Sequence, residues 1–285
     1  MPDKSYIIPS TDDPGKLLVP VVGPLVSILV PCCGMLEYTK LLIPSILRHT
    51  RPPFELIFID IGSLDGTAEY LAGVATIHPT IRAEVVRTPT DLGIKDACKE
   101  AITKARGEFL VLLNNDTVVT NGWLNQLLGL LNLSPAVGMV GPMSNYAAPP
   151  QLVETVPYRV GPKKLARLEG RYGTSDVLVD VEAVEAFARD FREKHKGKWV
   201  ETDRLGGFCL ILKKEALVKI GPLDPWSDLS LFDTDILSSK ARQAGFTLAV
   251  CRDLFVHHFG ARTFAGGAPE KKVGETGGVS SSMAS

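Results

Sequence analysis

The chain has 285 residues, 45% of them hydrophobic, and a formal net charge of −1. This length and composition suffice for one large domain or two modest ones with a sizeable core. The near-neutral charge argues against a dedicated nucleic-acid-binding protein, because such proteins usually carry a basic excess or a basic stripe.

Cysteine usage and the N-terminus both predict a cytoplasmic protein. The five cysteines show no spacing typical of a disulfide framework, and two of them, Cys32 and Cys33, are adjacent. We therefore expect five reduced thiols. The N-terminus is polar and contains acids, unlike a signal peptide.

One uncharged run, from Leu17 to Leu36, is long enough to cross a membrane. It is interrupted by Pro20, Pro24 and Pro31, so an entry segment followed by a buried strand fits it better. We expect no transmembrane segment, and peripheral association with the inner face of the membrane stays open.

Segments with the character of strands and helices alternate through the first half of the chain. The apolar run at 109–113, for example, is typical of a strand buried on both faces of a parallel sheet. The expected strands are 25–30, 55–60, 81–87, 109–113 and 137–140, and the expected helices are 36–49, 65–73, 92–106 and 123–133. This order predicts an α/β fold with a mostly parallel central sheet flanked by helices, as in Rossmann-like domains.

The alternation stops near Asn145. After it we expect a charged surface helix over 181–196, a strand over 205–212, helices over 214–220 and 236–244, and strands over 247–251 and 255–258. The expected organisation is an N-terminal arm (1–23), one domain (24–265) with halves 24–145 and 146–265, and a Gly- and Ser-rich disordered tail (266–285).

Acids stand at the ends of three expected elements. Asp116 follows the 109–113 strand, where an exposed carboxylate could bind a hard divalent cation, although Asn and Asp also favour turns. Asp60 closes the second strand, where acids of nucleotide-binding folds accept hydrogen bonds, or it is simply a turn residue. Asp233 and Asp235 precede a helix, and the alternative role for either is an N-cap.

Two adjacent histidines, His257 and His258, follow the last strand. A lone histidine is more often structural, but a pair at a strand end is a candidate for metal binding. Adjacent side chains on a strand point to opposite faces, so at most one should reach a common site. Walker A, Gly-Xaa-Gly-Xaa-Xaa-Gly and Gly-Xaa-Ser-Xaa-Gly motifs are absent, which weighs against dehydrogenases and hydrolases of those types.

Taken in order, these segments resemble family 2 glycosyltransferases of the GT-A fold. The matching segments are Val26–Pro31 (opening strand), Asp60–Thr67 (Asp-Asn-Gly-Ser loop), Leu92-Gly93, Arg106–Glu108, Asn114–Thr117 (Asp-Xaa-Asp motif), Gly207–Cys209 with Lys213–Glu215, Asp233–Asp235 (acidic motif) and Phe255–Gly260 (closing histidines). Two departures concern the site directly: Ile61 replaces an Asn, and Asn114 replaces the first Asp of Asp-Xaa-Asp.

The resemblance implies a metal-dependent, inverting glycosyltransferase that uses a UDP-, GDP- or dTDP-linked sugar. Its acceptor would be a glycan, a lipid-linked compound or another hydroxyl compound, as in the synthesis of polysaccharides or other cell-surface glycans. Implied donor-binding residues are Pro31, Asp60, Gly62, Gly93, Asn114 and Asn115; acceptor-binding residues are Gly207 and Phe208; ligands of Mn²⁺ or Mg²⁺ are Asp116 with His257 or His258; and the catalytic base is Asp233 or Asp235.

Helix capping favours Asp233 as the base. If the helix begins at Asp235, that carboxylate serves the helix end, and Asp233 lies ahead of it and can point into the cleft. Two other functional classes stay open. One is a sugar-phosphate nucleotidyltransferase, although 32–35 lacks the basic residues of its usual loop, and the other is an inactive module that binds glycans or a protein partner. The sequence does not indicate an oligomeric state.

Overall fold

The fold was analysed in a computed structural model. It describes residues 5–8, 19–51, 53–77, 81–88, 93–160, 179–221 and 234–260. The expected tail and Asp233 lie outside these ranges.

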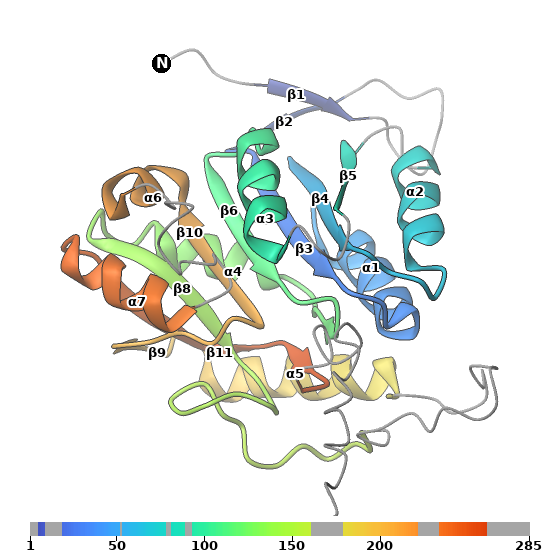
Figure 1. The fold of residues 1–285 in the computed structure, drawn as a ribbon. Coiled ribbons are helices and arrows are strands. Elements are labelled where there is room, and N and C mark those ends of the chain that lie inside the picture. Colours follow the sequence, from blue (N-terminus) through green and yellow to red (C-terminus); the bar gives the residue numbers. More distant parts are fainter. Residues whose placement is uncertain are drawn as a thin grey trace, which may run out of the picture.

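An eight-stranded mixed sheet forms the centre of the molecule, in the order β5-β4-β3-β6-β10-β8-β11-β9 (Figure 1). Its strands in chain order are β3 (Val26–Cys32), β4 (Phe54–Ile61), β5 (Ala83–Thr88), β6 (Phe109–Leu113), β8 (Val137–Met143), β9 (Trp199–Thr202), β10 (Cys209–Lys213) and β11 (Thr247–Phe255). The pairs β5/β4, β4/β3, β3/β6 and β8/β11 are parallel, and β10 is antiparallel to both of its neighbours. The predicted α/β fold with a mainly parallel sheet is confirmed.

Helices cover both faces of this sheet. They are α1 (Leu36–His49), α2 (Thr67–Ile77), α3 (Gly93–Lys104), α4 (Trp123–Leu131), α5 (Val181–His195), α6 (Lys214–Ile220) and α7 (Thr234–Gln243). Apolar side chains of α1, α2 and α4 pack on one face, and those of α3, α6 and α7 pack on the other. Within β6, Val111 faces the first layer and Leu112 the second, which is why the strand is apolar at every position.

The strand directions bring several loops to one edge of the sheet. The parallel strands β3, β4 and β6 all end at this edge. Strand β10 is antiparallel to both β6 and β8, so β8 runs in the same direction as β6, and β8 and its parallel neighbour β11 also end at this edge. β10 begins at the same edge, with Cys209 opposite Leu113. We call it the carboxyl edge.

Two small sheets complete the described fold. β7 (Thr117–Val118) pairs antiparallel with β12 (His257–His258). In the expected N-terminal arm, β1 (Ser5–Ile8) pairs antiparallel with β2 (Val19–Val22). Among the described residues, no helix combines the length and apolar character needed to cross a membrane.

Most predicted elements are confirmed, several with different bounds. The helix expected over 236–244 begins at Thr234, and the strand expected over 247–251 extends to Phe255, so that the next strand is only His257–His258. The helices over 36–49 and 214–220 have the predicted bounds. The strand expected over 205–212 begins only at Cys209, because the preceding loop bonds elsewhere: the Gly206 N–H donates to Gln151 Oε1 at 2.7 Å. Helix α5 is only partly a surface helix, since Val184 and Ala188 are buried and the helix packs against β11.

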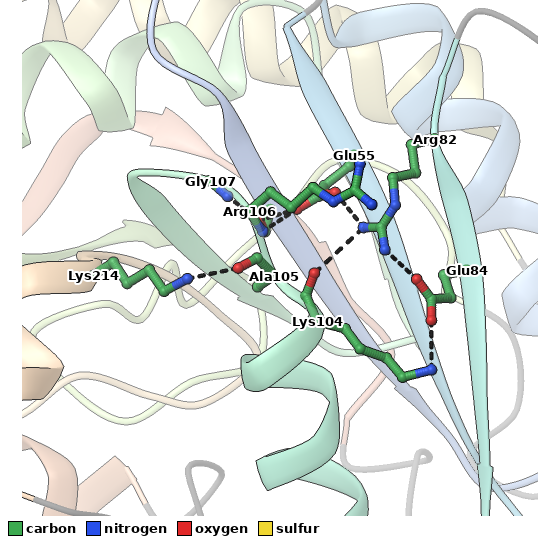
Figure 2. A network of polar contacts seen from close by, with 9 residues as sticks. Glu55, Arg82, Glu84, Lys104, Ala105, Arg106, Gly107 and Lys214 are labelled. Carbon is green, nitrogen blue, oxygen red and sulfur yellow. Dashed lines mark hydrogen bonds and ion pairs between the residues drawn. The ribbon is translucent and has the colours of Figure 1, made fainter.

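At the opposite, amino edge, a polar network joins β4, β5 and the end of α3 (Figure 2). The buried Glu55 carboxylate accepts hydrogen bonds from Ser27 Oγ (2.5 Å) and the Arg106 N–H (2.6 Å) and pairs with Arg82. Arg82 also pairs with Glu84. These contacts fix strands at the end of the sheet away from the carboxyl edge.

Candidate active site

The order in which the chain adds strands to the sheet reverses between β3 and β6. From β3 the chain adds β4 and then β5 on one side, and later adds β6 on the other. In open α/β sheets, ligands bind outside the carboxyl ends of strands at such a switch point. Pro31 near the end of β3, Asp60 near the end of β4 and Asn114 after β6 surround this point.

Asp116 and His258 meet at this edge. Pairing of β7 with β12 sets His258 opposite Thr117, next to Asp116. Asp116 Oδ1 lies 3.4 Å from His258 Nε2, and the Phe259 N–H donates to the Asp116 carbonyl at 2.9 Å. The expectation that Asp116 is exposed is wrong, because its side chain is fully buried.

The His258 ring is held from three sides. Its Nδ1 lies 2.8 Å from the Tyr146 carbonyl oxygen, which can only accept a hydrogen bond. Nδ1 therefore donates this hydrogen bond, and Nε2 faces Asp116. Phe208 stacks on the ring at 5.2 Å between centroids, and the Tyr146 ring meets it edge-on at 5.4 Å.

His257 points elsewhere, as expected for neighbouring residues on a strand. Its Nδ1 lies 2.9 Å from Tyr158 Oη, and its ring packs edge-on against Phe259. Burial, followed by the nearby charge of His258, lowers the pKa of His257 to about 3. Its buried Nε2 has no hydrogen-bond partner among the described residues. The structure thus places His258, rather than His257, against Asp116.

The two asparagines before Asp116 have different surroundings. The Asn115 amide is buried and donates to the Gly34 carbonyl (3.1 Å) and Thr39 Oγ1 (3.0 Å), so it braces the loop after β3. Asn114 is partly exposed, and its N–H donates to the Phe208 carbonyl at 2.9 Å. Asn114 is therefore the one of the two whose side chain has access to a ligand.

Asp60 is fully buried at the end of β4. Its Oδ1 accepts the Ser63 N–H at 3.2 Å, and its Oδ2 lies 3.2 Å from Nε of the half-exposed Arg87. Oδ2 accepts no hydrogen bond from the described residues, which leaves a buried acceptor at the switch point. Gly62 forms the turn after it with φ 59°.

Asp65 joins the two loops that border the switch point. Its Oδ1 accepts from the Thr67 N–H and hydroxyl, so Asp65 caps the start of α2. Its Oδ2 accepts the Leu36 N–H at 3.0 Å, so it also serves the start of α1. No local pattern in the sequence signals this second contact, because Leu36 and Asp65 are distant along the chain.

For the remaining predicted site residues, the structure gives fewer contacts. Gly93 opens α3, and Gly207 lies in the loop before β10, next to Phe208. Asp233 lies outside the described residues. Asp235 is in the first turn of α7, which begins at Thr234, and its exposed carboxylate pairs with Arg204 at 3.1 Å.

Sequence reasoning missed one residue of the site. The Asn145 side chain accepts the His258 N–H (3.0 Å) and donates to the His258 carbonyl (3.0 Å). The sequence signal near Asn145 was only the end of the strand–helix alternation, which carries no information about a contact with residue 258.

The family model described as glycosyl transferase family 2 matches residues 27–216, more than half of the chain. The chain belongs to this family. Its match with an uncharacterized protein of Sinorhizobium fredii, y4gI, is 28% identical and covers 90% of the chain but 27% of that protein. The putative teichuronic acid biosynthesis glycosyltransferase TuaG of Bacillus subtilis is 30% identical over 33% of the chain and 36% of its own length. These matches therefore span only about a quarter to just over a third of the two relatives' own length.

Solved structures of glycosyltransferases share the fold. GalNAc-T7 with UDP, GalNAc and Mn²⁺ superposes with a TM-score of 0.57 at 15% identity, over 85% of this chain and 45% of that one. The mannosyltransferase PcManGT of Pyrobaculum calidifontis, in complex with GDP-Man and Mn²⁺, gives 0.54 at 18% identity, over 95% and 62%. The GT-A fold expected for a family 2 member is confirmed.

The donor atoms at this family 2 site suit a divalent ion. A carboxylate oxygen and an imidazole nitrogen 3.4 Å apart, with the other ring nitrogen bonded to a carbonyl, form a typical ligand pair with its outer support. Among the described residues, no group of three or more His, Cys, Asp and Glu side chains could hold a metal. A metal bound by the pair would therefore need further ligands, such as diphosphate oxygens and water.

Proposed function

We propose that this protein is a metal-dependent, inverting glycosyltransferase that transfers a sugar from a nucleotide-diphosphate sugar to a hydroxyl acceptor. The observation that carries the proposal is the Asp116–His258 pair at the carboxyl edge, beside the switch point between β3 and β6. The Mn²⁺ and nucleotides bound in the similar GalNAc-T7 and PcManGT structures support the same ligands here.

Each part of the site has a role in this proposal. Asp60, with its buried acceptor oxygen, would bind the base or ribose, and Asn114 would approach the donor from the end of β6. Asp116 and His258 would hold Mn²⁺ or Mg²⁺, which neutralises charge on the leaving diphosphate. Phe208, packed on His258, would border the acceptor.

Asp233 is the proposed base, and the surroundings of Asp235 support this choice. Asp235 lies in the first turn of α7, where a carboxylate stabilises the helix end, and it pairs with Arg204. An inverting displacement needs one base that takes the proton from the attacking hydroxyl. The helix begins at Thr234 rather than at Asp235, so Asp233 directly precedes it and the cap argument no longer separates the two acids. The pairing of Asp235 with Arg204 is what favours Asp233 as the base.

Nucleotide release from a panel of UDP-, GDP- and dTDP-sugars, with Mn²⁺ and with EDTA, tests the reaction class. We expect metal-dependent release of a nucleoside diphosphate. Release of pyrophosphate from a nucleoside triphosphate and a sugar phosphate would instead identify a nucleotidyltransferase. Binding without any turnover on a panel of glycan acceptors would identify an inactive binding module.

Two substitutions test the base. Asp233→Asn should reduce turnover by roughly 10²–10⁴-fold, the range for loss of a general base, while donor affinity stays the same. Asp235→Asn should cost much less activity, because Asn still serves a helix start. If Asp235→Asn abolishes turnover and Asp233→Asn stays active, the two roles are reversed.

A further inference from the structure

Asn145 makes a reciprocal contact with one residue far along the chain. Its Oδ1 accepts the backbone N–H of His258, and its Nδ2 donates to the backbone carbonyl of the same residue, both at 3.0 Å. The side chain of Asn145 thus imitates the edge of a neighbouring strand. It fixes the backbone of His258 in both position and direction.

The next residue fixes the ring. The Tyr146 carbonyl accepts from His258 Nδ1 at 2.8 Å, so consecutive residues of one loop hold both the backbone and the imidazole of His258. With Nδ1 bonded to this carbonyl, the other ring nitrogen, Nε2, faces Asp116 Oδ1 at 3.4 Å. The loop after β8 therefore sets which ring nitrogen faces the carboxylate.

A purely structural role explains these contacts less well. Residues 257–259 are already attached to the fold by the β7/β12 pairing and by the Phe259 N–H, which donates to the Asp116 carbonyl. The additional bonds from Asn145 and Tyr146 converge on the one residue whose side chain faces Asp116. Outer-shell hydrogen bonds of this kind orient metal-binding histidines.

We propose that Asn145 is a positioning residue for the metal ligand His258, and that it thereby sets the preference of the site for transition ions over Mg²⁺. The inference rests on the proposed metal-dependent function. Imidazole nitrogen binds first-row transition ions better than it binds Mg²⁺, which takes oxygen ligands. An oriented His258 should favour Mn²⁺ and Co²⁺, and a misoriented one should leave Mg²⁺ binding largely unchanged.

The test measures Mn²⁺, Co²⁺ and Mg²⁺ affinities by calorimetry, and Mn²⁺ by electron paramagnetic resonance, with the nucleoside diphosphate (UDP, GDP or dTDP) that binds best. Asn145→Ala should weaken Mn²⁺ and Co²⁺ binding by about 10–100-fold, the usual effect of losing an outer-shell partner. Mg²⁺ affinity should change by about threefold at most, since its ligands are oxygens. In a His258→Ala background, Asn145→Ala should cause no further loss.

Gln151→Ala is the matched control. The Gln151 amide also bonds two backbone groups, the Pro142 carbonyl and the Gly206 N–H, but it does not contact His258. This variant should keep the Mn²⁺/Mg²⁺ preference. Asn145→Ser, which removes the same two bonds with a smaller change in polarity, replaces the alanine variant if that one does not fold.

Three results would overturn the inference: unchanged Mn²⁺ affinity in a folded Asn145 variant, equal losses for Mn²⁺ and Mg²⁺, or the same additional loss when His258 is already alanine. Failure of the proposed function looks different. If the wild-type protein binds no divalent ion, or if His258→Ala leaves Mn²⁺ affinity unchanged, the metal assignment itself is wrong, and the role of Asn145 falls with it.

Discussion

Asp116 combines complete burial with an imidazole nitrogen as its neighbour at 3.4 Å. A buried carboxylate is costly unless hydrogen bonds or a cation compensate the lost hydration. A divalent ion bound by Asp116 and His258, as proposed, would be such a cation.

Asp116→Asn should separate ion binding from the stability of the fold. Asn matches Asp in size and the substitution removes one charge without leaving a cavity, so the melting temperature in EDTA should change by a few degrees at most. The increase in melting temperature on adding Mn²⁺ with nucleotide should disappear. Differential scanning calorimetry in EDTA and in Mn²⁺ measures both. A variant that melts much lower in EDTA would show that the carboxylate is structural.

The sequence indicated the two proposed ligands, but not the residues that support them. Asp116 and His258 are chemically conspicuous residues at strand ends, so pattern and resemblance marked both as candidates. Asn145 is an ordinary loop asparagine until folding brings it to residue 258, and its contacts are with backbone groups, which leave no trace in side-chain patterns. From the sequence, only one of His257 and His258 could be expected to reach the site, because neighbouring side chains on a strand point to opposite faces. The pairing of β12 with β7 shows that it is His258.

At the scale of elements, alanine substitutions at two glycines should change the stability of the fold in opposite directions. A Cβ on Gly107 would lie 2.6 Å from Ser27 N and 2.8 Å from the Leu25 carbonyl, where α3 leads into β6 beside β3. A Cβ on Gly129, in the exposed surface of α4, would meet nothing within 4 Å. The first glycine permits close approach of two backbones, and the second only weakens a helix.

We expect Gly107→Ala to lower the free energy of unfolding by about 1–3 kcal/mol, as overpacking does. Gly129→Ala should raise it by about 0.5–1 kcal/mol, because alanine is the better helix former. Urea denaturation monitored by circular dichroism provides both values. Equal effects of the same sign would contradict the placement of these residues.

The amino-edge network is expected to matter for stability alone. The buried Glu55 carboxylate forms an ion pair with Arg82, and Glu55→Gln removes its negative charge (Figure 2). We expect the free energy of unfolding to fall by about 3 kcal/mol, the lower part of the range for breaking a buried ion pair. Glu84→Gln, which breaks a more exposed pair with the same arginine, should cost about 1 kcal/mol or less.

Nucleotide affinity measured by calorimetry should stay the same in both glutamine variants, since the network lies at the edge opposite the site. Reduced affinity in Glu55→Gln would indicate that the two edges are energetically coupled.

Element boundaries show where sequence patterns are insufficient. The helix over 36–49 was predicted with its bounds despite Pro44, because its apolar residues recur on one face that meets the sheet. The strand before residue 213 was predicted too early, because Leu205 and Phe208 are buried without being part of a strand. Burial and strand geometry give the same signal in a short apolar run.

For the molecule as a whole, the cysteines give a simple test of packing. All five are free and buried, and burial raises the pKa of Cys98 to about 12 and raises the pKa of the other four thiols as well. Native protein at neutral pH should therefore react slowly with Ellman's reagent, and five thiols should react in denaturant.

Cys33 should react first in the native protein, because it is the least buried, with 9% of its surface exposed. Mass spectrometry of partly labelled protein identifies the site. Rapid labelling of Cys98 or Cys209 in native protein would contradict the described core.

The central position of β10 also sets an order of events at the ribosome. β6 and β8 emerge early, yet they never pair with each other, because β10 lies between them. A nascent chain that has emerged as far as Met143 therefore holds the four strands β5-β4-β3-β6 and the single strand β8, which has no partner in the main sheet yet. Such long-range closure is slow, and the unpaired edges are exposed to aggregation meanwhile. His258 is translated after every strand of the main sheet, so an interrupted translation product would retain the switch point but lack the neighbour of Asp116 and with it the proposed ion site.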